Sequence, residues 1–86
     1  MKKDITLTIS GTDIRFNMTP DIYSKYIDEV SSSKKVAPTK NMLMRAVHPD
    51  DKGALKPLLE MPSNTMQIAD VLLEKYSPDI DITVGE

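Results

Sequence analysis

The sequence predicts an α+β fold, in which a small antiparallel sheet packs against about four short helices. Apolar and polar residues alternate with the two-residue period of a β-strand near both ends of the chain. Between these stretches, apolar residues recur with the helical period. The chain has 86 residues, enough for one modest core, so we expect a single domain over residues 1–86.

A β-hairpin is predicted over residues 4–18. Apolar residues alternate with polar ones over Ile5–Ile9, and the alternation resumes over Ile14–Met18. The turn between these runs contains Gly11, which adopts a positive φ without steric cost. Because an isolated hairpin is only marginally stable in water, other elements must cover its apolar face.

Helices are predicted at residues 19–32, 38–48, 50–61 and 64–76. The first is the best marked, because Thr19 is a favourable N-cap and Pro20 suits the first helical position. The fourth follows Ser63 and Asn64, which offer a cap. Pro57 falls within the third and costs about 3 kcal/mol in a helix interior. We therefore expect a kink or two short pieces there.

A third strand is predicted over residues 79–84, where isoleucine and valine alternate with polar residues. We expect this strand to join the hairpin in one antiparallel sheet. We also expect the apolar face of that sheet to contact the first helix at Tyr26 and Ile27.

Composition excludes several classes of protein. The chain has no cysteine, which rules out disulfides, thiolate zinc sites and thiol catalysis. It has no apolar run of the roughly 20 residues that span a bilayer, and no secretory signal is visible, so we expect a cytoplasmic protein without membrane contact. The net charge of −2 argues against nucleic acid as the main partner.

The charge is unevenly distributed along the chain. Residues 1–48 carry eight Lys/Arg and five Asp/Glu, whereas residues 49–86 carry three and eight. The two parts therefore have net charges of +3 and −5. This asymmetry suits either head-to-tail self-association or ordinary surface variation.

No set of residues indicates catalysis. His48 is the only histidine, and the sequence supplies no nucleophile partner for it. Asp50 and Asp51 follow closely, but the run from His48 to Asp51 is interpreted as a helix boundary and not as a metal site. No glycine-rich phosphate loop is present. We therefore expect no enzyme activity, no cofactor and no metal.

The basic residues around the second helix are interpreted as a solvated loop, because no aromatic residues are interleaved with them; they are Lys34, Lys35, Lys40 and Arg45. The six methionines are more informative, because methionine suits both core filling and adaptable binding surfaces. Met42 and Met44 are two residues apart, so they cannot share one face of a helix. The predicted partner-binding residues are Met42, Met44, Leu58, Leu59 and Met61.

Several segments together resemble a family of bacteriophage tail assembly chaperones. They are the hairpin followed by Thr19-Pro20, the segment Tyr26–Glu29, the stretches Lys35–Pro38 and Asn41–Arg45, and the ending Leu72–Pro78 that leads to Ile82–Gly85. The resemblance covers nearly the whole chain but includes no catalytic signature.

This resemblance implies a small cytoplasmic protein that binds the tape measure protein and keeps it soluble until tail tube subunits polymerise around it. It also implies absence from the mature virion. Many such chaperones have a longer, frameshifted form that recruits tail tube protein. If that applies here, this chain is the short form and an extension begins close to residues 82–86.

Two other functions suit the same features. One is a small regulatory protein-binding module, of the antitoxin or anti-repressor type. The other is a minor virion protein, such as a tail completion or head–tail joining subunit. A tape measure gene directly downstream favours the chaperone, and a toxin gene favours the regulator.

Overall fold

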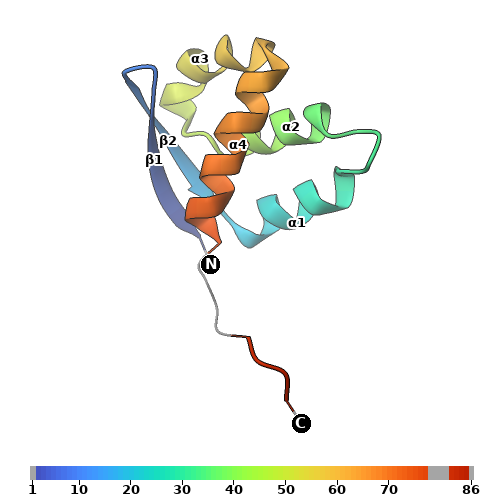
Figure 1. Ribbon diagram of the computed structural model, residues 1–86. Coiled ribbons are helices and arrows are strands. Elements are labelled where there is room, and N and C mark those ends of the chain that lie inside the picture. The colour runs from blue at the N-terminus through green and yellow to red at the C-terminus, as the bar shows by residue number, and fades with distance from the viewer. Residues whose placement is uncertain (1, 78–81, 86) are drawn as a thin grey trace.

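The computed structural model describes residues 2–77 and 82–85. Its helices and strands are β1 (Lys3–Ile9), β2 (Thr12–Met18), α1 (Pro20–Glu29), α2 (Val36–Ala46), α3 (Lys52–Leu55) and α4 (Pro62–Tyr76). Two 3₁₀ turns, η1 (Pro49–Asp51) and η2 (Leu58–Glu60), lie on either side of α3 in the sequence. The fold is α+β, as the sequence predicted (Figure 1).

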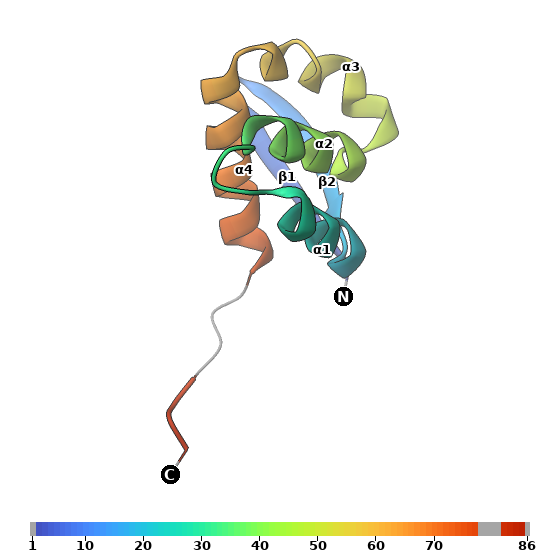
Figure 2. The ribbon, with the colours of Figure 1, turned by 90° about the vertical axis from the view of Figure 1, so that its right-hand side faces the viewer.

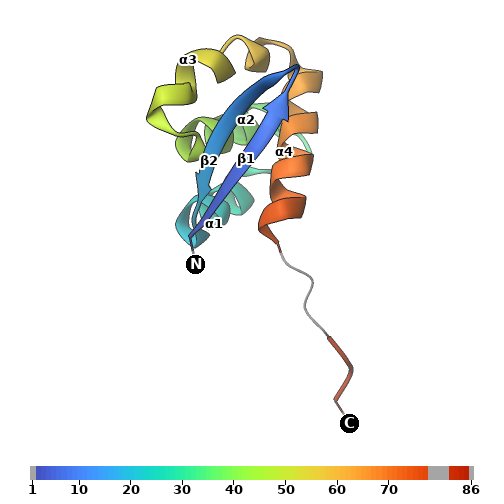
Figure 3. The ribbon, with the colours of Figure 1, turned by 90° about the vertical axis from the view of Figure 1, so that its left-hand side faces the viewer.

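The molecule has a hairpin layer and a helix layer. α4 lies along β1 and α2 lies behind β2, so these two helices cover the inner face of the sheet (Figure 3). α1 packs on α2, while α3 lies at the opposite end of the molecule (Figures 1 and 2). Of the two positions predicted to contact the sheet, Tyr26 is partly buried against the core, whereas Ile27 is 47% exposed. Only Thr19 separates β2 from α1, which places this helix at the end of the hairpin.

The hairpin has the predicted alternation and turn. Ile5 pairs with Phe16 and Leu7 pairs with Ile14, and all four side chains are buried. Ser10 and Gly11 form the turn with φ values of 50° and 83°. Positive φ at both positions gives a turn whose twist matches that of the two strands, and glycine adopts this conformation without strain.

The helix boundaries follow local chemistry. The Thr19 side chain accepts a hydrogen bond from the Ile22 amide at 3.1 Å, as predicted for an N-cap. α1 ends at Glu29, earlier than predicted, because Ser31 bonds to Lys34 through both backbone and side chain and closes a separate turn. α2 begins at Val36 rather than at 38, because a proline is tolerated in the first helical turn.

α4 begins at Pro62 and not at residue 64. The predicted Ser63–Asn64 cap does not form; instead the Met61 carbonyl accepts from the amides of Asn64 and Thr65. Proline is favoured at the first helical position, where no amide hydrogen is needed. The predicted third helix is interrupted near Pro57, so residues 49–60 form η1, α3 and η2.

The predicted third strand is wrong where the structure describes it. Ile82–Gly85 lies in no strand, and the side chains of Ile82 and Val84 are 77% and 89% exposed. The remaining predicted positions, 79–81, fall outside the described residues. Within the described chain the sheet consists of β1 and β2. Its inner face is already covered by α2 and α4, so the core does not require a third strand from this segment.

The core lies between the hairpin and the helices. The side chains of Ile14, Phe16, Met42 and Leu72 are at most 1% exposed. Further members come from both strands, α2, α3, η2 and α4, and they are Ile5, Leu7, Met18, Leu43, Ala46, Val47, Leu55, Leu59, Ile68 and Ala69.

Candidate functional site

The predicted partner-binding residues fall into two groups. Met42 and Leu59 belong to the core, with 0% and 2% of their surface exposed. Met44 and Leu58 are partly buried against that core, and Met61 is 58% exposed. In this conformation, only the partly buried and exposed members are accessible to a partner.

Leu58 and Met61 lie together on the surface. They line a shallow hollow of about 550 Å³, whose other lining residues are Pro57, Glu60, Pro62 and Asn64. Met44, on α2, does not line this hollow. We call this surface the η2 face. It combines two prolines with a large, flexible methionine side chain, a composition that suits contact with apolar side chains of varied shape.

Two side chains of α4 fix η2 in place. The Asn64 Nδ2 donates to the Leu58 carbonyl at 3.2 Å. The Thr65 hydroxyl donates to the Leu59 carbonyl at 3.2 Å and is fully buried. These bonds satisfy carbonyls that a short 3₁₀ turn leaves without helical partners. The backbone beneath the η2 face is therefore held, while Met61 remains exposed.

A second apolar surface lies on α1, and the sequence did not predict its exposure. The helix has no buried residue. Ile22, Tyr23 and Tyr26 are partly buried against the core, and Ile27 is 47% exposed. The ring of Tyr23 lies 5.9 Å from that of Tyr76. The helical spacing of this stripe was visible in the sequence, but nothing in it indicated that α2 and α4 would cover the sheet instead.

A third feature is an ion pair that closes the outer edge of β2. Asp51 accepts a hydrogen bond from the Arg15 backbone amide at 2.8 Å and from its side-chain Nε at 2.9 Å. The Arg15 Nη2 donates to the second carboxylate oxygen at 3.1 Å. Asp51 lies in the predicted helix boundary, and its side chain makes no capping bond to the start of α3. Because Nε and Nη2 of Arg15 bind different oxygens of Asp51, the ion pair is bidentate.

The ion pair shifts both pKa values. Hydrogen bonds from the Arg15 side chain and backbone lower the pKa of Asp51 to about 2, from an ordinary value of 3.8. The same hydrogen bond raises the pKa of Arg15. The folded protein therefore binds a proton at Asp51 less readily than the unfolded chain, and the stabilisation is present above the ordinary pKa and is lost as the pH falls towards 2.

We expect Asp51→Asn to lower the thermal midpoint at neutral pH and to flatten the decline of stability between about pH 4 and pH 2. The reason is that asparagine keeps the shape but removes the titrating carboxylate. Thermal unfolding followed by circular dichroism at several pH values measures both effects. Asp50→Asn is the matched control, because the Asp50 side chain is 77% exposed and lies 3.9 Å from Arg15. An equal change in both variants would contradict this assignment.

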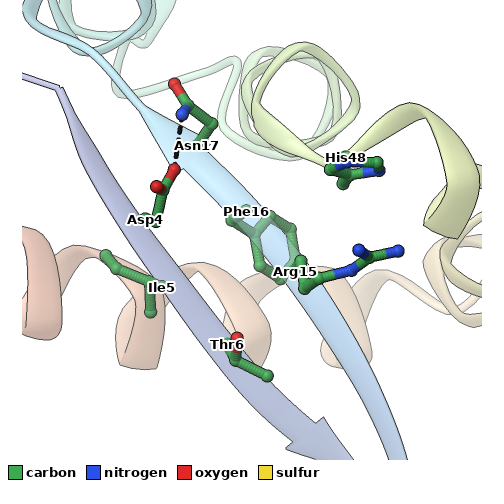
Figure 4. A pocket seen from close by; sticks show the side chains of 7 residues that line it. All are labelled: Asp4, Ile5, Thr6, Arg15, Phe16, Asn17 and His48. Carbon is green, nitrogen blue, oxygen red and sulfur yellow. Dashed lines mark hydrogen bonds between the residues drawn. The ribbon is translucent and has the colours of Figure 1, made fainter.

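His48 lies beside a small hollow of about 240 Å³ near β2 (Figure 4). The Nδ1 of His48 accepts from the Asp50 amide at 3.1 Å, so the ring caps η1, in line with its interpretation as a helix boundary. Asp4 and Asn17, which also line the hollow, bond to each other (Figure 4). The side chains of Asp4, Asn17 and Arg15 and the Nδ1 of His48 are thus engaged in structural bonds.

Three further features concern other predicted sites. Arg45, part of the basic stretch, pairs with Glu29 at 3.2 Å and joins α2 to α1. In the part of the chain that the structure describes, no three His, Cys, Asp or Glu side chains lie together as metal ligands would. None of the helices described is long and apolar enough to cross a membrane.

Comparison with known proteins gives the class. The sequence profile of the phage tail assembly chaperone family matches residues 5–86. The chain is also 31% identical over 84 residues to a protein of Haemophilus phage HP1 (strain HP1c1), described as an uncharacterized 11.3 kDa protein in the lys 3′ region. That alignment covers 98% of this chain and 82% of the relative. No solved structure gives a significant match.

The chain belongs to the phage tail assembly chaperone family. Membership confirms the resemblance predicted from the sequence, and it implies a non-catalytic role in tail assembly.

Proposed function

We propose that this protein binds the tape measure protein of its phage and keeps it soluble in the host cytoplasm until the tail tube polymerises. The observation that carries the proposal is the family match, which spans almost the whole described fold. It favours the tail assembly role over the regulatory and virion alternatives. A longer, frameshifted form that recruits tail tube protein, and absence from the mature virion, are part of the same proposal.

The η2 face is the proposed contact surface for apolar helical segments of the tape measure protein. Met61 and Leu58 provide its accessible apolar side chains. Met44 lies on α2 outside this face and is a separate, partly buried candidate contact. Leu59 anchors this turn in the core, whereas Met42 is a core residue of α2. A helix binds such a surface by placing apolar side chains from successive turns against it, and methionine adapts to segments of different shape.

The test is a pull-down of a tape measure fragment by the purified protein. The fragment comes from the tape measure gene, which we expect directly downstream. We expect wild-type protein to retain it and Met61→Asp to weaken its binding about tenfold or more, because a charge replaces a central apolar contact. Binding should have a negative heat-capacity change and depend weakly on salt, since apolar burial drives it.

Ile27→Asp is the matched control. Ile27 is 47% exposed on α1, so the substitution makes the same chemical change on the other apolar surface. We expect it to bind as wild type does. Loss of binding in Ile27→Asp with normal binding in Met61→Asp would transfer the contact to α1. Failure of wild-type protein to retain the fragment would contradict the proposed function itself.

A further inference from the structure

The two edges of the sheet differ. The outer edge of β2 is closed around Arg15, whose carbonyl accepts from the His48 amide at 2.8 Å and whose amide donates to Asp51. Phe16 also forms a β-bridge with Val47. This edge therefore has partners for its central backbone groups.

Among the described residues, the outer edge of β1 has no comparable hydrogen-bond partners at its centre. The two-residue turn makes Ile9 and Thr12 a hydrogen-bonded pair. Hydrogen-bonded and non-hydrogen-bonded pairs alternate along an antiparallel ladder, so the backbone N–H and C=O groups of Thr6 and Thr8 point away from β2. Arg15, the partner of Thr6, confirms this register, because its backbone carbonyl points away from β1 and accepts from His48. Among the described residues, no hydrogen bond from outside the hairpin reaches the backbone of Thr6 or Thr8.

The centre of β1 also lacks the devices that protect edge strands. Ile5–Ile9 contains no charged residue and no proline. Edge strands that must stay single are usually interrupted by lysine, proline or a bulge, because their free amides and carbonyls pair readily with another strand. An unprotected edge of this kind favours a partner strand.

A hollow of about 400 Å³ runs beside this edge, between β1 and α4. Its lining includes Leu7 and Ile9 from the inner face of the strand and Ile68 and Val71 from the helix. Val71 is 46% exposed, a high fraction for a valine on the side of α4 that faces the sheet edge. A strand added to β1 would direct alternate side chains over these apolar groups.

The chain itself contains a segment of matching chemistry. Ile82 and Val84 are two residues apart, so an extended backbone places both on one face and Thr83 on the other. Both apolar side chains are largely exposed in their own chain. The order Ile82-Thr83-Val84 also resembles that of Ile5-Thr6-Leu7, and threonine and aliphatic side chains pair well across adjacent strands.

We propose that the outer edge of β1 binds the Ile82–Gly85 segment of a second copy of this chain as an added strand. Ile82 and Val84 then lie over Val71 and the neighbouring hollow, while Thr83 faces solvent beside Thr6 and Thr8. Donor and acceptor are different surfaces, so each copy offers both.

Sedimentation equilibrium of the full chain over a range of concentrations tests this proposal. The wild-type mean mass should rise with concentration. Val71→Asp, which alters the acceptor, and the double variant Ile82→Asp/Val84→Asp, which alters the donor, should each weaken self-association about tenfold or more. Ile27→Asp is the matched control, since Ile27 and Val71 have nearly equal exposure, and it should associate like wild type.

Mixing the two defective variants gives the most specific result. The double variant keeps an intact acceptor and Val71→Asp keeps an intact donor, so the mixture should form heterodimers more tightly than either variant associates with itself. Circular dichroism establishes that each variant is folded. Wild-type protein that stays monomeric at all concentrations, a double variant that associates normally, or a mixture without heterodimers would each overturn the proposal. None of these outcomes bears on tape measure binding, which the pull-down measures separately.

Discussion

Phe16→Ala is expected to lower the free energy of unfolding by about 3–5 kcal/mol. The Phe16 side chain is 1% exposed, its residue pairs with Ile5 across the hairpin, and it bridges to Val47 after α2. Removing the ring leaves a cavity where the hairpin meets the helix layer. A small domain has a total stability of about 5–15 kcal/mol, so this loss is a large share of it. Urea denaturation followed by circular dichroism measures the change.

Phe16→Leu provides the graded control. Leucine fills most of the space, so a loss of about 1–2 kcal/mol is expected. The account of the core would be wrong if alanine at this position cost no more than leucine.

Leu72→Ala is expected to cost about 2–5 kcal/mol, whereas Val71→Ala should change stability by about 0.5–1 kcal/mol at most. The two residues are adjacent on α4, but Leu72 is fully buried and Val71 is 46% exposed. The pair therefore tests which face of α4 packs on the hairpin. Thermal and urea unfolding of both variants measure the difference, and a larger loss for Val71→Ala would show that the helix is rotated from the position described.

Local chemistry in the sequence predicted the elements whose structure depends on near neighbours. The alternation over residues 4–18 and the positive φ at Gly11 follow from the pattern of the hairpin itself. The N-cap at Thr19 and the interruption near Pro57 follow from single residues with strong conformational preferences.

The prediction was wrong where tertiary packing decides. Both α1 and α4 have an apolar stripe, and the sequence does not rank them as partners for the sheet. In the structure α4 takes that place, which leaves Ile27 on α1 half exposed. The segment with Ile82 and Val84 has the period of a strand, but the hairpin is covered without it.

The sequence indicated which residue types form the candidate site, but it did not indicate which of their side chains are exposed. Spacing alone established that Met42 and Met44 could not share one face of α2, and Met42 is in fact the core residue. Spacing could not show which of Leu58 and Leu59 is exposed and which is buried. Both lie in the 3₁₀ turn η2, whose orientation depends on hydrogen bonds from Asn64 and Thr65. The bidentate pair of Arg15 and Asp51 joins residues 36 positions apart, which no local pattern indicates.

The central claim is that this chaperone family member keeps a tape measure protein soluble. Its most direct test is the sedimentation of a tape measure fragment after co-expression with the full chain, with Met61→Asp, or with neither. The account predicts that the fragment is mainly in the supernatant with the wild-type chain, and mainly in the pellet with the variant or alone. A fragment that pellets equally in all three cases, while the chain itself is folded and abundant, would contradict the account.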